Sequence, residues 1–212
     1  MNFAEREAYG HKIEYDFERF CDRYKLEVIH TAIETRHKVT WNMNMNYADA
    51  QNFWDKIDYS KTIIDYKMLF KKWLLKNNNN QTPAWERHGP DRLVICRPEK
   101  SNSKYIKCGF SIKSKMKDSH KFYTIEAMEL FAHRINEQHY DCKIYYVFPP
   151  DNYSPEWRFC SAKDLLRSSE YFEPPDWWKG SRKPCFKVSC KMIYKPLWIL
   201  FETNFSHYAG SI

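Results

Sequence analysis

Two short polar groups in the second half of the chain could together carry out metal-assisted hydrolysis. Asp91 follows Pro90 at the start of one strand-like run, while Ser111 and Lys113 close the next one. Because strand side chains alternate, Ser111 and Lys113 lie on one face, and a hairpin would bring them to the same edge as Asp91. A carboxylate binds a hard divalent cation through oxygen, and a lysine beside it can orient or deprotonate a water molecule that attacks a phosphodiester.

The elements that must position these residues are two strands, a helix and a further buried strand. Residues 91–98 and 104–113 have strand character, and apolar and polar residues alternate in the second run. Apolar positions return at helical spacing from residue 124 to about 138. Residues 142–148 are nearly all apolar, as in a strand buried on both faces. This order predicts an α/β core.

The segments around this core predict further elements. An amphipathic helix is expected at 5–24, a strand at 26–33 and a second helix at 59–76. After the core, we expect a short strand at 157–161, a helix capped by Ser161, and a last strand within 183–193.

The expected fold is α/β, with a central mixed β-sheet flanked by helices and an additional helical N-terminal region. Residues 1–76 form that region, as part of the same domain or as a small subdomain. The asparagine-rich segment 77–89 is a loop or linker. Residues 90–212 form the α/β core.

The order of these elements resembles that of the PD-(D/E)XK nucleases: an opening helix with Gly10 and Glu14, the two strands with Asp91 and Lys113, a helix and a buried strand. It is similar above all to archaeal Holliday-junction resolvases and compact restriction or homing endonucleases. The resemblance implies a restriction endonuclease-like fold and a Mg²⁺ or Mn²⁺ cofactor. It also implies that Asp91 binds the metal and that Lys113 is the lysine of the final motif, with Glu14 near the metal.

Ser111 stands where this family usually has Asp or Glu. A hydroxyl does not replace the charge of a carboxylate on magnesium. One branch of restriction enzymes has the same S-x-K pattern, with the metal-binding glutamate moved onto the next helix. By this resemblance Glu126, in the first turn of the expected helix, takes that role, with Glu129 in reserve on nearly the same face. An acid in a first helical turn also complements the helix dipole, so a structural role for Glu126 stays open.

A basic segment surrounds the motif. Between Arg97 and Lys121 there are eight cations and two acids, within a chain of net charge +7. Such a bias suits a phosphate backbone, although a solvated lysine-rich surface would look the same. The candidate DNA-binding residues are Arg97, Lys100, Lys104, Lys107, Lys115, Lys117 and Lys121.

Other residues are weaker candidates for chemistry. Asp58 with Asp65 and Lys67 repeats the acid pattern, but only seven residues separate the acids and the segment has helical periodicity. His133 is expected to be structural. Trp177, Trp178 and Trp198 could stack on unpaired bases, although aromatic residues are more commonly packed in cores.

Composition places the chain among globular, intracellular proteins. Hydrophobic residues make up 43% of the 212, yet no apolar run approaches the roughly 18 residues that cross a bilayer. The N-terminus lacks the pattern of a secretion signal, and the seven scattered cysteines suit buried thiols better than disulfides. We therefore expect a cytoplasmic protein with no membrane partner and no small-molecule cofactor.

The expected function is that of a Mg²⁺-dependent DNA endonuclease. A homodimer would suit this function, because a duplex has two strands to cut. The alternative is a catalytically inactive nuclease-fold protein that binds DNA or a partner protein, as Ser111 suggests. A third reading is an interaction protein with no nucleic-acid role.

Overall fold

The computed structural model describes residues 3–30, 89–96, 105–114, 121–139, 142–173 and 184–205. The expected helix at 59–76, the pattern formed by Asp58, Asp65 and Lys67, and nearly all of the loop at 77–89 lie outside the described residues. The described helices are α1 (Phe3–Asp22), α6 (Ala127–His139), α7 (Ala162–Ser168) and α8 (Leu197–Phe205), with a 3-10 turn at Cys190–Met192.

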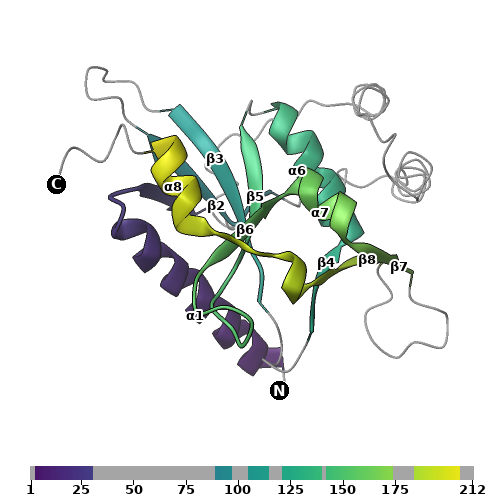
Figure 1. The fold of residues 1–212 in the computed structure, drawn as a ribbon. Helices are drawn as coiled ribbons and strands as arrows, with labels where there is room; N and C mark the ends of the chain where they lie inside the picture. The colour runs from purple at the N-terminus through teal and green to yellow at the C-terminus, as the bar shows by residue number, and fades with distance from the viewer. Residues whose placement is uncertain are drawn as a thin grey trace.

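A six-stranded mixed sheet forms the centre of the fold (Figure 1). Its order is β1-β2-β3-β5-β6-β9, and only the β3–β5 pair among these strands is parallel. The strands are β1 (Glu27–His30), β2 (Arg92–Cys96), β3 (Tyr105–Ile112), β5 (Lys143–Phe148), β6 (Arg158–Ser161) and β9 (Lys195–Pro196). The expected α/β fold with a central mixed sheet and flanking helices is confirmed.

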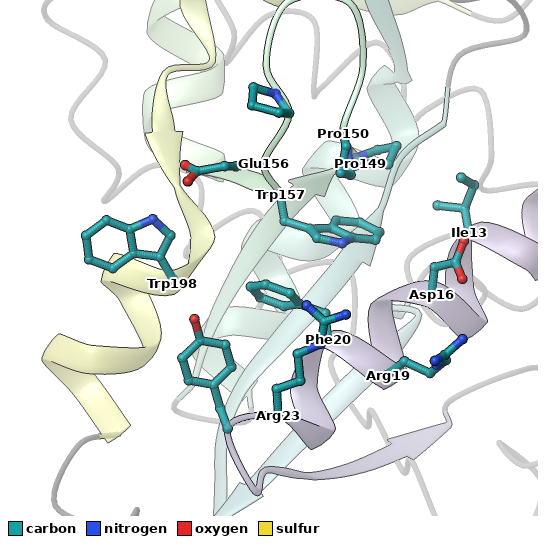
Figure 2. Close-up of a pocket in the computed structure, with 12 residues that line it drawn as sticks. Ile13, Asp16, Arg19, Phe20, Arg23, Pro149, Pro150, Glu156, Trp157 and Trp198 are labelled. Carbon is teal, nitrogen blue, oxygen red and sulfur yellow. The ribbon is translucent and has the colours of Figure 1, made fainter.

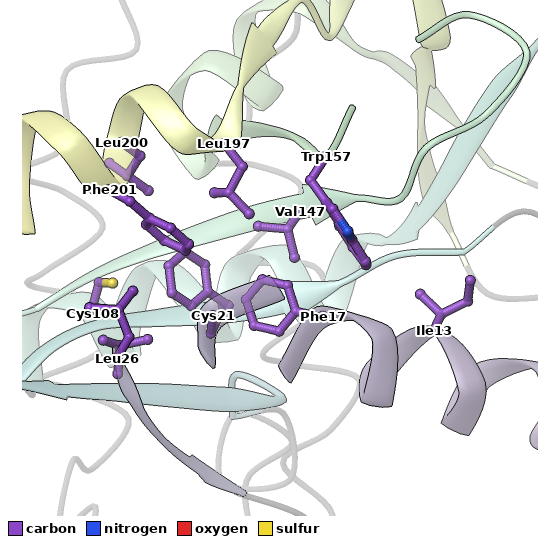
Figure 3. Packing of buried hydrophobic residues seen from close by; sticks show 12 residues of the cluster. Ile13, Phe17, Cys21, Leu26, Cys108, Val147, Trp157, Leu197, Leu200 and Phe201 are labelled. Atoms are coloured by element: carbon purple, nitrogen blue, oxygen red, sulfur yellow. The ribbon is translucent and has the colours of Figure 1, made fainter. Parts of the chain in front are cut away.

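Helices cover both faces of this sheet. The apolar stripe of α1, with Ile13, Phe17 and Cys21 at four-residue spacing, packs on one face together with α8 (Figure 3). The Phe17 ring lies edge-on to Phe110 of β3 and to Trp157, with centroid separations of 5.2 and 5.5 Å. Helices α6 and α7 contact β5. Burying each large apolar side chain of this core contributes about 1.5–3 kcal/mol.

A second, three-stranded sheet has the order β4-β8-β7, all antiparallel. Its strands are β4 (Phe122–Glu126), β8 (Cys185–Ser189) and β7 (Glu170–Phe172). The prediction that the helix begins at residue 124 is therefore wrong, because Thr124 to Glu126 pair with β8. Tyr123 and Ile125 are buried while Phe122 and Thr124 are exposed, which is the two-residue period of a half-buried strand.

A buried polar network joins the two sheets. The Tyr123 hydroxyl donates to Asp151 Oδ2 at 2.9 Å, and Arg158 Nη2 lies 2.8 Å from the same oxygen. Arg158 Nη1 also donates to the carbonyl oxygens of Cys190 and Ile193. Because the side chains of Arg158 and Asp151 are almost fully buried, the ion pair and the two carbonyl hydrogen bonds offset part of the cost of desolvation.

The other predicted elements of the described chain are found close to their expected places. They are α1, β1, β2, β3, β5, β6, α7 and β8. Ser161 caps α7 as expected, because its hydroxyl accepts from the Asp164 amide at 3.0 Å. Six described cysteines are free thiols. None of the described helices combines the length and the apolar character that a membrane crossing requires.

Candidate active site

The hairpin of β2 and β3 places Asp91 beside Ser111. The antiparallel register pairs Arg92 with Phe110, so Asp91, one residue before β2, lies level with Ser111. Asp91 Oδ2 accepts from the Ile112 amide at 2.6 Å and from the Ser111 hydroxyl at 3.3 Å. These two bonds fix the orientation of the carboxylate.

Gly109 allows this approach. A Cβ atom at Gly109 would lie 2.9 Å from the ring of Pro90 and 3.1 Å from Ile144. Only a residue without a side chain leaves room for Pro90 against β3, and Pro90 carries Asp91 into the site.

The second carboxylate comes from α6. Glu129, in the first turn of that helix, accepts from the Ser111 hydroxyl at 2.8 Å through Oε1. The same oxygen forms an ion pair with Lys113 Nζ. Both carboxylates therefore lie within 3.3 Å of one serine hydroxyl, which is itself almost fully buried.

Residues behind Glu129 complete the cluster. The Nδ1 atom of His133 lies 3.9 Å from Glu129 Oε1 and 2.8 Å from the hydroxyl of Tyr146 on β5. Lys113 Nζ lies 5.7 Å from the centre of the Tyr146 ring, within range of a cation–π contact. His133 is fully buried, which agrees with the structural role expected for it.

Mutual electrostatics set the charges of the cluster. Burial alone would raise the pKa of Glu129, but Lys113, His133 and the hydrogen bonds from Lys113 and Ser111 lower it to about 2. Burial disfavours the Lys113 ammonium, yet Glu129 and Asp91 outweigh it and raise the pKa of Lys113. Burial raises the pKa of Asp91, against the opposing effect of Lys113. Lys113 is therefore a cation at neutral pH and holds its proton.

The donor set suits a hard cation. Asp91 and Glu129 offer carboxylate oxygens, and the contacts found in the described chain use one oxygen of each, Oδ2 and Oε1. Within the described ranges, no three His, Cys, Asp or Glu side chains are grouped to hold a metal. Mg²⁺ is commonly held by one or two carboxylates and completes its shell with water and substrate phosphate. The two acids fit Mg²⁺ or Mn²⁺ in that manner.

Arg92 links this site to α1, which sequence reasoning missed. Its Nε and Nη2 atoms bind Glu18 and Glu14 at 2.7 and 2.8 Å, and Nη1 donates to the Asp91 carbonyl at 2.8 Å. The resemblance placed Glu14 near the metal, and the structure places it on the arginine next to Asp91. The available sequence signal was the four-residue spacing of Glu14 and Glu18, which puts both on one helix face.

The two glutamate candidates lie in different elements. Glu126 is the last residue of β4, opposite Cys185 of β8, and not in the first turn of the helix as predicted. Its charge contributes to the raised pKa of Lys113. Glu129, the reserve candidate, is the one bonded to Ser111 and Lys113.

Few of the predicted DNA-binding cations fall within the described residues. Lys107 lies in β3, and Lys121 is exposed immediately before β4. Arg97, Lys100, Lys104, Lys115 and Lys117 lie outside the described residues.

Comparison with known proteins gives matches in structure only. No family model matches the sequence, and no curated protein matches it. A nuclease from a fusselovirus matches at 14% identity with a TM-score of 0.39, covering 77% of this chain and 95% of that chain. Hjc, a Holliday junction resolvase from the archaeal hyperthermophile Archaeoglobus fulgidus, matches at 14% identity with a TM-score of 0.31, covering 70% and 93%.

Proposed function

We propose that this protein is a Mg²⁺-dependent DNA endonuclease that hydrolyses phosphodiester bonds at the cluster formed by Asp91, Ser111, Lys113 and Glu129. The observation that carries the proposal is the convergence of both carboxylates on the Ser111 hydroxyl, with Lys113 paired to Glu129. Two acids and a lysine held in this way supply oxygen ligands and a fixed positive charge in one place.

Asp91 and Glu129, rather than Glu126, would hold the metal ion. When bound, Mg²⁺ supplies Lewis acidity for the scissile phosphate and lowers the pKa of a water molecule. Lys113, paired with Glu129, would stabilise negative charge on the phosphate and orient the attacking water. Ser111 does not replace the missing acid of the strand motif. Its single hydroxyl proton can be donated to Glu129 at 2.8 Å or to Asp91 at 3.3 Å, and the hydroxyl lies between the two carboxylates.

The substrate in this proposal is DNA, held through its phosphates by the basic residues around the motif. Of these, Lys121 is exposed in the described chain. The protein would act in the cytoplasm, and a homodimer would place one site on each strand of a duplex.

The test uses a matched pair of glutamate variants three residues apart. Purified wild-type protein is incubated with labelled duplex and branched DNA, with Mg²⁺, with Mn²⁺ or with a chelator. Glu129→Gln should lose metal-dependent cleavage by about 100-fold or more, because a neutral amide is a poor magnesium ligand. Glu126→Gln should cleave close to the wild-type rate.

Cleavage that persists in the chelator, or that survives Glu129→Gln unchanged, would overturn the proposal. A second candidate function follows from Ser111, since the strand motif lacks its acid: an inactive nuclease fold that only binds DNA or a partner protein. If the wild type cuts no DNA while Ser111→Glu does, the binding-only function is correct.

A further inference from the structure

A pocket of about 630 Å³ lies away from the Asp91 cluster, between α1, the segment 149–157 and the start of α8 (Figure 2). None of its lining residues belongs to the candidate active site. Its volume is within the range of small-molecule and cofactor sites, roughly 300–1,000 Å³. The pocket is therefore large enough to bind a ligand group separate from the one at the Asp91 cluster.

Helix α1 contacts both Arg92, next to Asp91, and the pocket. Glu14 and Glu18 face Arg92 on one flank of the helix. Asp16 and Phe20 line the pocket, and at about 100° per residue they lie on the opposite flank. One helix thus carries a face toward the proposed cleavage site and another toward the pocket.

Aromatic rings form one wall of the pocket. Trp157 is buried beneath it, with its ring centroid 6.2 Å from that of Phe20, and Phe20 in turn lies 5.3 Å from Tyr24. Trp198, half-buried in the first turn of α8, stands on the other side (Figure 2). This arrangement offers a planar ligand aromatic faces on more than one side.

Charged groups line the rest of the pocket. Arg19 is in the last turn of α1, and Arg23 directly follows the end of the helix at Asp22. Both are exposed and line the pocket, so both guanidinium groups are available to an anion at this end of it. Asp16 and Glu156 add carboxylates. Carboxylates repel phosphate but accept hydrogen bonds from the exocyclic amino groups of bases such as cytosine.

We propose that this pocket binds one unpaired nucleotide of a DNA substrate, with its base against the aromatic wall and its phosphate on Arg19 and Arg23. The inference rests on the DNA-binding part of the proposed function. A paired base in a duplex has both faces stacked on its neighbours, so only an unpaired base can present a face to Trp198. The substrate class is therefore DNA that contains a single-stranded segment.

The test measures binding without cleavage, using full-length protein in a chelator and fluorescence anisotropy of labelled DNA. The three probes have equal length. The first is a perfect duplex, and the second is a duplex with a short gap in one strand that leaves cytosines of the other strand unpaired. The third has the same gap, with abasic sugars in place of the unpaired cytosines. The gap that exposes cytosines should bind about tenfold more tightly than the abasic one, which has the same backbone and no bases. Trp198→Ala should reduce that preference at least fivefold. Arg23→Gln should instead weaken binding of both gapped DNAs, because they share the phosphate that Arg23 would hold, and duplex affinity should stay unchanged in both variants.

The matched controls are Tyr194→Ala, which removes another exposed aromatic ring, and Arg167→Gln, which removes an exposed arginine of α7. Both should keep the preference. Equal affinity for the cytosine and abasic gaps overturns the proposal. If, in addition, Trp198→Ala converts a dimer into a monomer in sedimentation, the pocket is a contact between two copies of the chain.

The outcomes separate this inference from the nuclease proposal. Suppose that the protein never cleaves DNA with Mg²⁺ but prefers the cytosine gap, and that Trp198→Ala removes this preference. This result supports nucleotide binding in the pocket and contradicts the nuclease proposal. Cleavage of duplex DNA without any preference for exposed bases contradicts the pocket alone. Failure to bind all three DNAs overturns both.

Discussion

Replacing Lys113 with methionine should change how the stability of the protein depends on pH. Methionine keeps the length and apolar stem of lysine and removes its charge. Lys113 is paired with Glu129, both side chains are only 16% exposed, and Lys113 is the largest influence that lowers the pKa of Glu129. In the variant, two carboxylates near one serine hydroxyl would face each other without that cation.

The magnitude follows from the pKa of Glu129, which lies at about 2 compared with an ordinary value of 4.5. At about 1.4 kcal/mol for each pKa unit, this difference corresponds to at most about 3–4 kcal/mol of folding free energy at neutral pH. Because the folded-state pKa is depressed, the contribution is present above 4.5 and is lost as the pH falls toward 2. Burial is already the largest single influence on Glu129, and in the variant the main effect that opposes it is gone. The pKa of Glu129 should therefore rise, and lowering the pH should relieve the destabilisation.

The assay is urea unfolding followed by tryptophan fluorescence, at about pH 7 and about pH 3. The free energy of unfolding should differ between wild type and Lys113→Met by about 2–3 kcal/mol near pH 7, and the difference should shrink toward pH 3. Lys163→Met, which changes an exposed lysine of α7, is the control and should shift stability by less than about 0.5 kcal/mol. A difference that stays constant over this range would refute the assignment of the Glu129 charge to Lys113.

Three further results are expected. Arg92→Met should lower the free energy of unfolding by about 3 kcal/mol, because two glutamates of α1 lose their buried partner; in the same urea titration, the exposed Arg167→Met should cost less than about 0.5 kcal/mol. Gly109→Ala should cost about 1–3 kcal/mol and slow cleavage, because the added methyl group would press on Pro90 at 2.9 Å; wild-type stability and rate would contradict the close-approach argument. Affinity for duplex DNA should fall steeply between low and moderate salt, because each neutralised phosphate releases counterions; a flat response in anisotropy titrations would remove the basic segment from the interface.

The strands of the hairpin could be predicted because their signal is local. In β3, Cys108 and Phe110 point into the α1–α8 core, and Ser111 lies on the opposite face, where α6 supplies Glu129. This two-residue period is visible in consecutive residues, so predicting the strand requires no information from elsewhere in the chain. The same alternation was sufficient to predict that Ser111 and Lys113 share a face.

The start of α6 could not be predicted in the same way. Ile125 fits both a helical period and a strand period, and what decides between them is the pairing of β4 with β8, some sixty residues further along the chain. The choice between Glu126 and Glu129 depends on this boundary, so a local misassignment changed the leading metal-ligand candidate. The Arg92 contacts are also long-range, joining residues 74 and 78 positions apart. The second sheet depends on such pairings throughout.

Because the second carboxylate is carried by α6 rather than by β3, the order in which the chain folds controls when chemistry becomes possible. Asp91 reaches Ser111 and the Ile112 amide as soon as the β2–β3 hairpin closes, about twenty residues along the chain. Glu129 joins them only when α6 docks and β5 adds to β3 in the parallel pair that requires a crossover. Long-range parallel pairing is among the slower steps of folding. A newly made or partly unfolded chain would therefore hold an incomplete site, and the proposed cleavage would require the finished fold.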